Sequence, residues 1–120
     1  MKLNELRPIL YTTDLKGTIA FYKEVLGFSC ISFDENRASM KKDEIEIMLS
    51  LPNEHIHFEK PNFTGSFYFT TDNVDQCWEE INGKAAIVYP VENFEYGMRE
   101  FAVYDNNGYI LQFGQEINGK

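Results

Sequence analysis

Hydrophobic and polar residues alternate in two short segments that stand almost half a chain apart, at residues 9–14 and 67–72. Each segment is an apolar strand that ends in Thr-Thr-Asp, and Thr12 and Thr70 are 58 positions apart. Side-chain oxygens of Thr and Asp can accept the free N–H groups of a following helix. The pattern therefore predicts two copies of a strand followed by a capped helix.

The first copy continues as a helix that ends at Gly27, with apolar residues at helical spacing: Leu15, Ile19, Tyr22 and Leu26. Turn residues then separate three predicted strands, at residues 29–33, 37–41 and 44–49. The first copy is thus a βαβββ module that occupies about residues 5–50.

The second copy repeats this order over about residues 65–116. Its helix stops at Asn82-Gly83 and is marked by four residues: Val74, Cys77, Trp78 and Ile81. Three strands are predicted after it, at residues 85–89, 98–104 and 109–114. Residues 51–64, between the modules, form a linker without a clear period, and residues 91–97 are predicted to be an irregular loop.

Because side chains in a strand point alternately to opposite faces, the predicted strands divide into two sets. One set is uniformly apolar and belongs against the helices: Leu10, Ile45, Ile47, Leu49, Phe67, Phe69, Phe101, Val103, Leu111 and Phe113. The other set mixes polar, charged and aromatic groups: Arg7, Ile9, Tyr11, Glu46, Met48, Ser66, Tyr68, Glu100, Ala102, Tyr104, Ile110 and Gln112. The second set suits a wet ligand cleft, with plain solvent exposure as the alternative.

Composition narrows the class of protein. The 120 residues fit one domain, and 43% hydrophobic and 15% aromatic residues are enough for a core and for stacking on a ligand. A net charge of −8 argues against a nucleic-acid partner, and no apolar run is long enough for a membrane span. We therefore expect a cytoplasmic protein, in which the isolated Cys30 and Cys77 are reduced core residues.

Residues 8–28, which include Pro-Ile-Leu-Tyr-Thr-Thr-Asp-Leu and end in Leu-Gly-Phe, resemble the opening of the vicinal oxygen chelate superfamily. This superfamily includes glyoxalase I, extradiol dioxygenases and bleomycin-resistance proteins. Residues 67–75 and 99–108 extend the resemblance, and the latter look especially like the closing hairpin of bleomycin-resistance proteins. The resemblance implies an α+β fold in which two βαβββ modules form curved mixed sheets around a cavity, and a homodimer that closes it.

Metalloenzymes of that superfamily hold a divalent ion with His, Glu or Gln from four equivalent strand positions. The resemblance places these positions at Arg7, Met48, Ser66 and Gln112, of which only Gln112 is a suitable ligand. We therefore expect neither a metal nor another cofactor. His55 and His57 are expected to be solvated loop residues, with ligand contact at the cavity rim or a metal site as alternatives.

These observations favour a binding protein of the bleomycin-resistance type, which sequesters a drug or metabolite without altering it. The expected ligand is small, planar or aromatic, and preferably cationic, and no residue is assigned a catalytic role. The residues expected to contact it are Arg7, Tyr11, Glu46, Met48, Tyr68, Tyr96, Glu100, Tyr104 and Gln112. The alternatives are a lyase or dioxygenase with a non-standard site, a metal-free catalyst using Glu46 or Glu100, and an interaction domain with a filled cavity.

Overall fold

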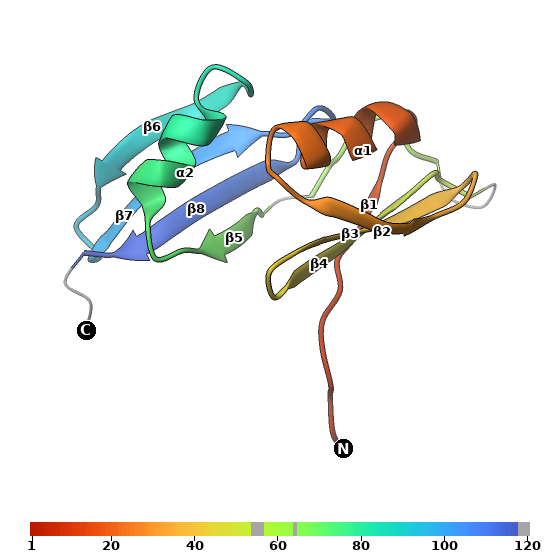
Figure 1. Cartoon of the computed structure of the whole chain (residues 1–120), viewed down its shortest axis with the longest axis horizontal. Coiled ribbons are helices and arrows are strands. Elements are labelled where there is room, and N and C mark those ends of the chain that lie inside the picture. The colour runs from red at the N-terminus through yellow and green to blue at the C-terminus, as the bar shows by residue number, and fades with distance from the viewer. Residues whose placement is uncertain (54–56, 64, 118–120) are drawn as a thin grey trace. The chain divides into compact units, whose positions relative to one another are not determined.

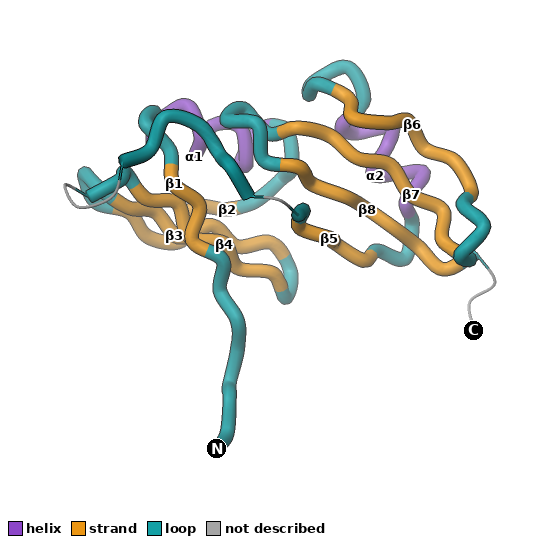
Figure 2. Tube along the Cα trace, turned by 180° about the vertical axis from the view of Figure 1, so that it is seen from behind, coloured by secondary structure: helices purple, strands orange, loops and turns teal. Residues whose placement is uncertain are grey.

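The chain forms two compact units, Met1–Lys60 and Pro61–Lys120 (Figure 1). The computed structural model describes residues 1–53, 57–63 and 65–117. Each unit contains one four-stranded mixed sheet with one helix on one of its faces, as Figure 2 shows from behind. The α+β class and the two βαβββ modules are therefore confirmed. No helix in the described part of the chain is long and apolar enough to cross a membrane.

The first unit contains one helix, α1 (Leu15–Glu24), and four strands: β1 (Ile9–Tyr11), β2 (Ser29–Phe33), β3 (Arg37–Lys42) and β4 (Ile45–Ser50). The sheet has the order β1-β4-β3-β2, in which β1 runs parallel to β4 and the other pairs are antiparallel. As the alternation predicts, Leu10, Ile47 and Leu49 are buried, whereas Ile45, at the start of β4, is 41% exposed.

The second unit contains one helix, α2 (Val74–Ile81), and four strands: β5 (Phe67–Thr70), β6 (Ile87–Asn93), β7 (Met98–Tyr104) and β8 (Ile110–Glu116). The order β5-β8-β7-β6 repeats that of the first unit, with β5 parallel to β8. The core beneath α2 contains Phe101, Val103 and Leu111, all fully buried.

The predicted Asp cap is correct for α1 but not for α2. Asp14 accepts the backbone N–H of Gly17 at 3.0 Å, whereas in the second unit Asn73, one residue beyond Asp72, accepts that of Gln76 at 3.1 Å. Both are short side chains with an acceptor oxygen, so either can satisfy a free N–H of the first turn. The second helix consequently starts one residue later in the repeat.

The prediction that residues 91–97 form an irregular loop is wrong for residues 91–93, which belong to β6. Pro90, which follows the predicted strand at residues 85–89, cannot donate a ladder hydrogen bond and would be unfavourable in a central strand. However, β6 is an edge strand, and its pairing with β7 is irregular on both sides of Tyr89. An edge strand with such irregularities tolerates proline, and so β6 continues past it.

The two cysteines are free, as expected, but Cys30 and Cys77 are only partly buried, so the expectation that both lie in the core is wrong. Cys30 lies on β2, which forms an edge of its sheet, and Cys77 lies on α2 with its thiol near Thr71. Apolar spacing alone did not distinguish these half-covered positions from buried ones.

Candidate functional site

A buried carboxylate lies at the centre of the second sheet. Glu100, on β7, has no exposed surface and belongs to the set of residues that the alternation places opposite α2. Strand register brings its neighbours close, because Glu100 pairs with Gly114 of β8, and Gln112 of β8 pairs with Tyr68 of β5. A buried carboxylate requires hydrogen-bond donors or a cation.

Two tyrosines and one amide supply these donors, and a third tyrosine lies nearby. The Tyr68 hydroxyl donates to Glu100 Oε1 at 2.8 Å, and the Tyr89 hydroxyl donates to Oε2. Gln112 Nε2 lies 3.2 Å from the same Oε2, and the Tyr96 hydroxyl is close enough to Glu100 to help lower the pKa of its carboxyl. We call Glu100 with Tyr68, Tyr89, Tyr96 and Gln112 the Glu100 cluster.

The donors fix the charge of the Glu100 cluster. Burial raises the pKa of the Glu100 carboxyl, but the hydrogen bonds from Tyr89, Tyr68, Tyr96 and Gln112 outweigh burial and hold the pKa below its ordinary value. Burial and the bond to Glu100 raise the pKa of Tyr89 to about 12, and the same causes raise the pKa of Tyr68 further. At neutral pH the cluster is therefore one carboxylate surrounded by neutral phenols.

Gly114 makes this arrangement possible. The Tyr68 side chain reaches from β5 across β8 to Glu100 on β7, and its hydroxyl lies directly over Gly114. A β carbon at residue 114 would overlap the Tyr68 ring and hydroxyl. The strand glycine is thus a site of close side-chain approach and not a weak point in the strand.

Aromatic rings extend the Glu100 cluster to the surface. Tyr89 contacts Phe94 edge to face, with centroids 5.5 Å apart, and Phe94 stacks on Tyr96 at 5.4 Å with an interplanar angle of 13°. Tyr68 is 41% exposed and Tyr96 is 62% exposed, although Glu100 itself is buried. A ligand at this surface would therefore contact phenol rings that are hydrogen-bonded to an anion.

The structure brings four of the predicted ligand residues together, namely Tyr68, Tyr96, Glu100 and Gln112. Tyr104, farther along β7, is 38% exposed. Tyr89 was not among the predicted ligand residues, because the expected strand ended there. In the structure Tyr89 pairs with Ala102 of β7. Ala102 belongs to the same predicted face as Glu100, so a pairing of these two strands would have added Tyr89 to that face.

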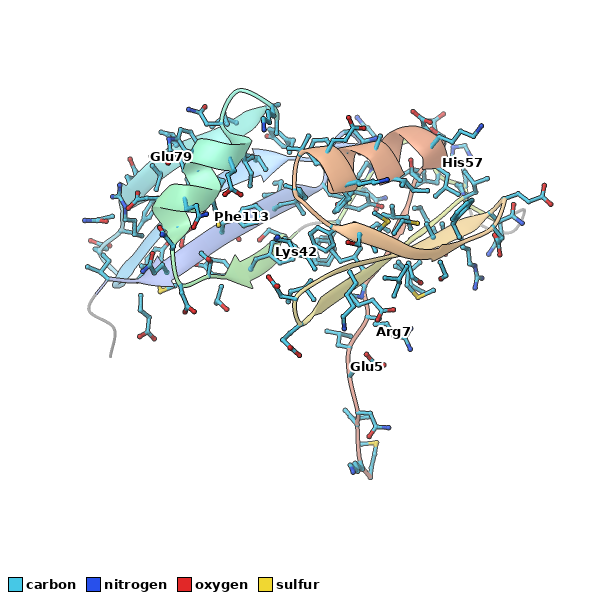
Figure 3. All side chains as sticks on the ribbon, viewed as in Figure 1. Glu5, Arg7, Lys42, His57, Glu79 and Phe113 are labelled. Atoms are coloured by element: carbon cyan, nitrogen blue, oxygen red, sulfur yellow. The ribbon has the colours of Figure 1, made fainter. Side chains whose placement is uncertain are left out.

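The other predicted residues lie in the first unit. Arg7 forms an ion pair with Glu46 at 3.1 Å and another with Glu5 at 3.2 Å, and Figure 3 labels Arg7 and Glu5 on the N-terminal segment. Glu46, which was expected to attract a cation from a ligand, therefore already shares one within the unit. Met48 lies on β4, and the Tyr11 ring meets the edge of Phe58 at a centroid distance of 6.0 Å.

Trp78 and His57 both lie outside the Glu100 cluster. Trp78 packs on Phe101 at a centroid distance of 5.2 Å, which agrees with a core role. His57 is exposed and lies 3.7 Å from Glu59, as expected of a solvated loop residue. His55 lies outside the described residues.

The four positions that correspond to the metal ligands of the superfamily do not fit a divalent ion. Gln112 Oε1 accepts a hydrogen bond from Ser66, and Gln112 Nε2 donates to the Tyr89 hydroxyl at 2.7 Å, so this amide is fully used within the unit. Arg7 is a permanent cation, and the Met48 thioether is too soft for Mg²⁺ or Mn²⁺. Among residues 1–53, 57–63 and 65–117, no group of three His, Cys, Asp or Glu side chains could hold a metal.

Each unit is a βαβββ module, and in each mixed sheet the first strand of the module lies beside the fourth. The chain is therefore an α+β protein built from two copies of one module. Residues 2–113 match the Glyoxalase/Bleomycin resistance protein/Dioxygenase superfamily, and the chain belongs to this family.

Several similar proteins match this chain over most of its length at low sequence identity. Virulence protein STM3117 of Salmonella typhimurium is 26% identical over 119 residues, which covers 91% of this chain and 81% of the relative. A glyoxalase/bleomycin resistance protein/dioxygenase from Nocardioides superimposes with a TM-score of 0.84 at 14% identity, over 100% of this chain and 87% of the other. A lactoylglutathione lyase from Agrobacterium tumefaciens gives 0.73 at 18%, over 93% and 92%.

Proposed function

We propose that this protein binds a small molecule and holds it unchanged, and that the Glu100 cluster is the centre of the binding site. The observation that carries the proposal is the buried, ionised Glu100, which accepts hydrogen bonds from the hydroxyls of Tyr68 and Tyr89 and lies near Tyr96. Tyr68 and Tyr96 are also exposed to solvent. The site thus combines fixed negative charge with aromatic surface.

This chemistry favours a cationic, planar ligand. A hydroxyl that donates to a carboxylate polarises its ring, and a cation over such a ring gains about 0.5–2 kcal/mol. Stacking of a planar group on Tyr96 adds about 0.5–1.5 kcal/mol beyond burial. Several such contacts give micromolar affinity after the entropy cost of binding.

The same groups are poorly suited to proton transfer. A general base or acid works best with a pKa near the working pH. The pKa of Glu100 lies below its ordinary value, and those of Tyr68 and Tyr89 lie far above neutrality. The cluster therefore favours binding over catalysis, and with it the sequestering, bleomycin-resistance type of function within the family. Bleomycin-type glycopeptides, which are cationic and carry planar groups, are the first ligands to test.

Calorimetry with a panel of cationic, neutral and anionic aromatic compounds tests the proposal. We expect cationic members to bind and Glu100→Gln to weaken them about tenfold or more, because the negative charge is lost. Tyr96→Leu, at an exposed position, is expected to cost about three- to tenfold through the lost ring. The Tyr96→Leu variant keeps the test informative if the Glu100→Gln variant folds poorly.

The matched control is Glu79→Gln, which makes the same charge change on α2, on the opposite face of this sheet (Figure 3). We expect it to leave affinity unchanged within about twofold. Equal losses in Glu79→Gln and Glu100→Gln, binding of anionic compounds only, or conversion of a bound compound would each contradict the proposal.

A further inference from the structure

The first unit contains a cavity of its own, which has different chemistry from the Glu100 cluster. Its volume is about 520 Å³, within the range of small-molecule sites, and it is formed by β1, the β2–β3 turn, β3 and residues 50–53. Strand register places three of its residues in one row across the sheet, because Arg37 of β3 and Tyr11 of β1 both pair with Ser50 of β4.

Two charged side chains, Asp34 and Arg37, line this cavity. Asp34 Oδ1 accepts the backbone N–H groups of Asn36 at 2.8 Å and Arg37 at 3.0 Å, and these bonds hold the pKa of Asp34 below its ordinary value, which the Arg37 charge also lowers. Ser50 donates to the carbonyl of Leu51 at 2.8 Å. In contrast, the Arg37 guanidinium makes no ion pair with any residue that the structure describes.

An arginine in such a position suits a flat oxyanion. Its guanidinium presents N–H donors in a fixed fork that matches the two oxygens of a carboxylate, whereas an ammonium group would act only as a point charge. Tyr11, held by the edge contact with Phe58, offers an aromatic surface in the same row, and Ile9 lines the wall beside it.

We propose that this cavity binds a planar molecule that carries a carboxylate, with the carboxylate on Arg37 and the planar body against Tyr11. The proposal goes beyond the function assigned to the Glu100 cluster, because the two sites lie in different units and select opposite charges. It also gives a role to an exposed arginine on a cavity wall that has no ion pair with the residues described, in a protein that is acidic as a whole.

The test uses benzoate, benzamide and benzamidinium, which share a ring and a planar end group but carry negative, zero and positive charge. Each is titrated into the full-length ¹⁵N-labelled protein while the backbone amide resonances are recorded. We expect benzoate to shift the amides of Asn36, Arg37 and Leu51 with saturation, and the other two probes to shift them far less.

Arg37→Gln is expected to weaken benzoate binding about tenfold or more, because a charge-assisted bidentate pair is lost. The side chain of Arg37 forms no ion pair with the residues that the structure describes, whereas its backbone forms the turn. The matched control is Lys41→Gln, which removes the same charge from the same face of β3 outside the cavity and is expected to change affinity less than twofold.

Glu100→Gln should not alter benzoate binding, so that failure of this proposal and failure of the proposed function give different results. The proposal is overturned if benzoate does not shift the cavity amides, if Arg37→Gln binds benzoate as well as the wild type, or if Lys41→Gln loses as much affinity. Stronger binding of benzamidinium than of benzoate at these amides would overturn it as well.

Discussion

Glu100 combines two roles at a single residue, since it is both the anion of the proposed site and a buried hydrogen-bond acceptor. Replacement by Gln would keep the shape of the side chain but turn an N–H₂ group toward donors such as Tyr89 and Gln112. Leaving buried polar groups unmatched costs about 1–3 kcal/mol. We therefore expect Glu100→Gln to lower the free energy of unfolding by about that amount at neutral pH.

The pH dependence of this difference follows from the pKa of Glu100, which is lower in the folded protein than its ordinary value of 4.5. The charged form is favoured by folding, so its contribution is complete above the ordinary value and disappears as pH falls through the folded value. Urea denaturation at a series of acidic pH values should show the difference between wild type and Glu100→Gln shrinking in this window. A difference that grows as pH falls would contradict the assignment.

At the scale of elements, Gly114 of β8 and Tyr68 of β5 depend on each other. Gly114→Ala would drive the Tyr68 ring away from Glu100, and we expect a loss of about 1–3 kcal/mol from the displaced hydrogen bond and overpacking. In the background of Tyr68→Ala the same substitution should cost less than about 0.5 kcal/mol, because the overlapping ring is gone. Equal costs in both backgrounds, measured by urea denaturation, would show that the two residues are not coupled.

The elements themselves were largely predictable from the sequence. Apolar periods of two and of 3.6 residues identified the eight strands and the two helices, because each element buries one face. The predicted strand ended at Tyr89, whereas β6 continues through Pro90 to Asn93, because an edge strand tolerates proline and strand order is a tertiary property. The N-cap of α2 is Asn73, one residue beyond the predicted Thr-Thr-Asp. Asp and Asn are about equally favourable at this position, so residue type alone does not distinguish Asp72 from Asn73.

The site was predictable only in part. Alternation assigned Tyr68, Glu100 and Gln112 to one face, as the structure confirms through their hydrogen bonds. It did not reveal that Glu100 is buried among tyrosine hydroxyls or that Tyr89 takes part, because partner choice depends on register and side-chain reach. Alternation also placed Arg7 and Glu46 on one face, and the structure shows that they form an ion pair.

For the whole molecule, we predict a two-fold homodimer. The edge strand β2 exposes Ile31 at 54% and Phe33 at 75%, and such an apolar edge is commonly covered by another chain. Closed two-fold pairing is also the commonest form of assembly, so light scattering should give about 28 kDa, twice the 14.0 kDa of the chain. A single 14.0 kDa species at micromolar concentration would refute the prediction.

The central claim is that the Glu100 cluster holds a cationic, planar molecule without altering it. Native mass spectrometry of the protein purified from its host, followed by release of the bound molecule, tests the claim most directly. We predict a single small cation whose mass is unchanged after prolonged incubation with fresh protein, and which Glu100→Gln retains in a much smaller fraction of chains. Release of an altered molecule, or equal retention of the same molecule by wild type and Glu100→Gln, would contradict the claim.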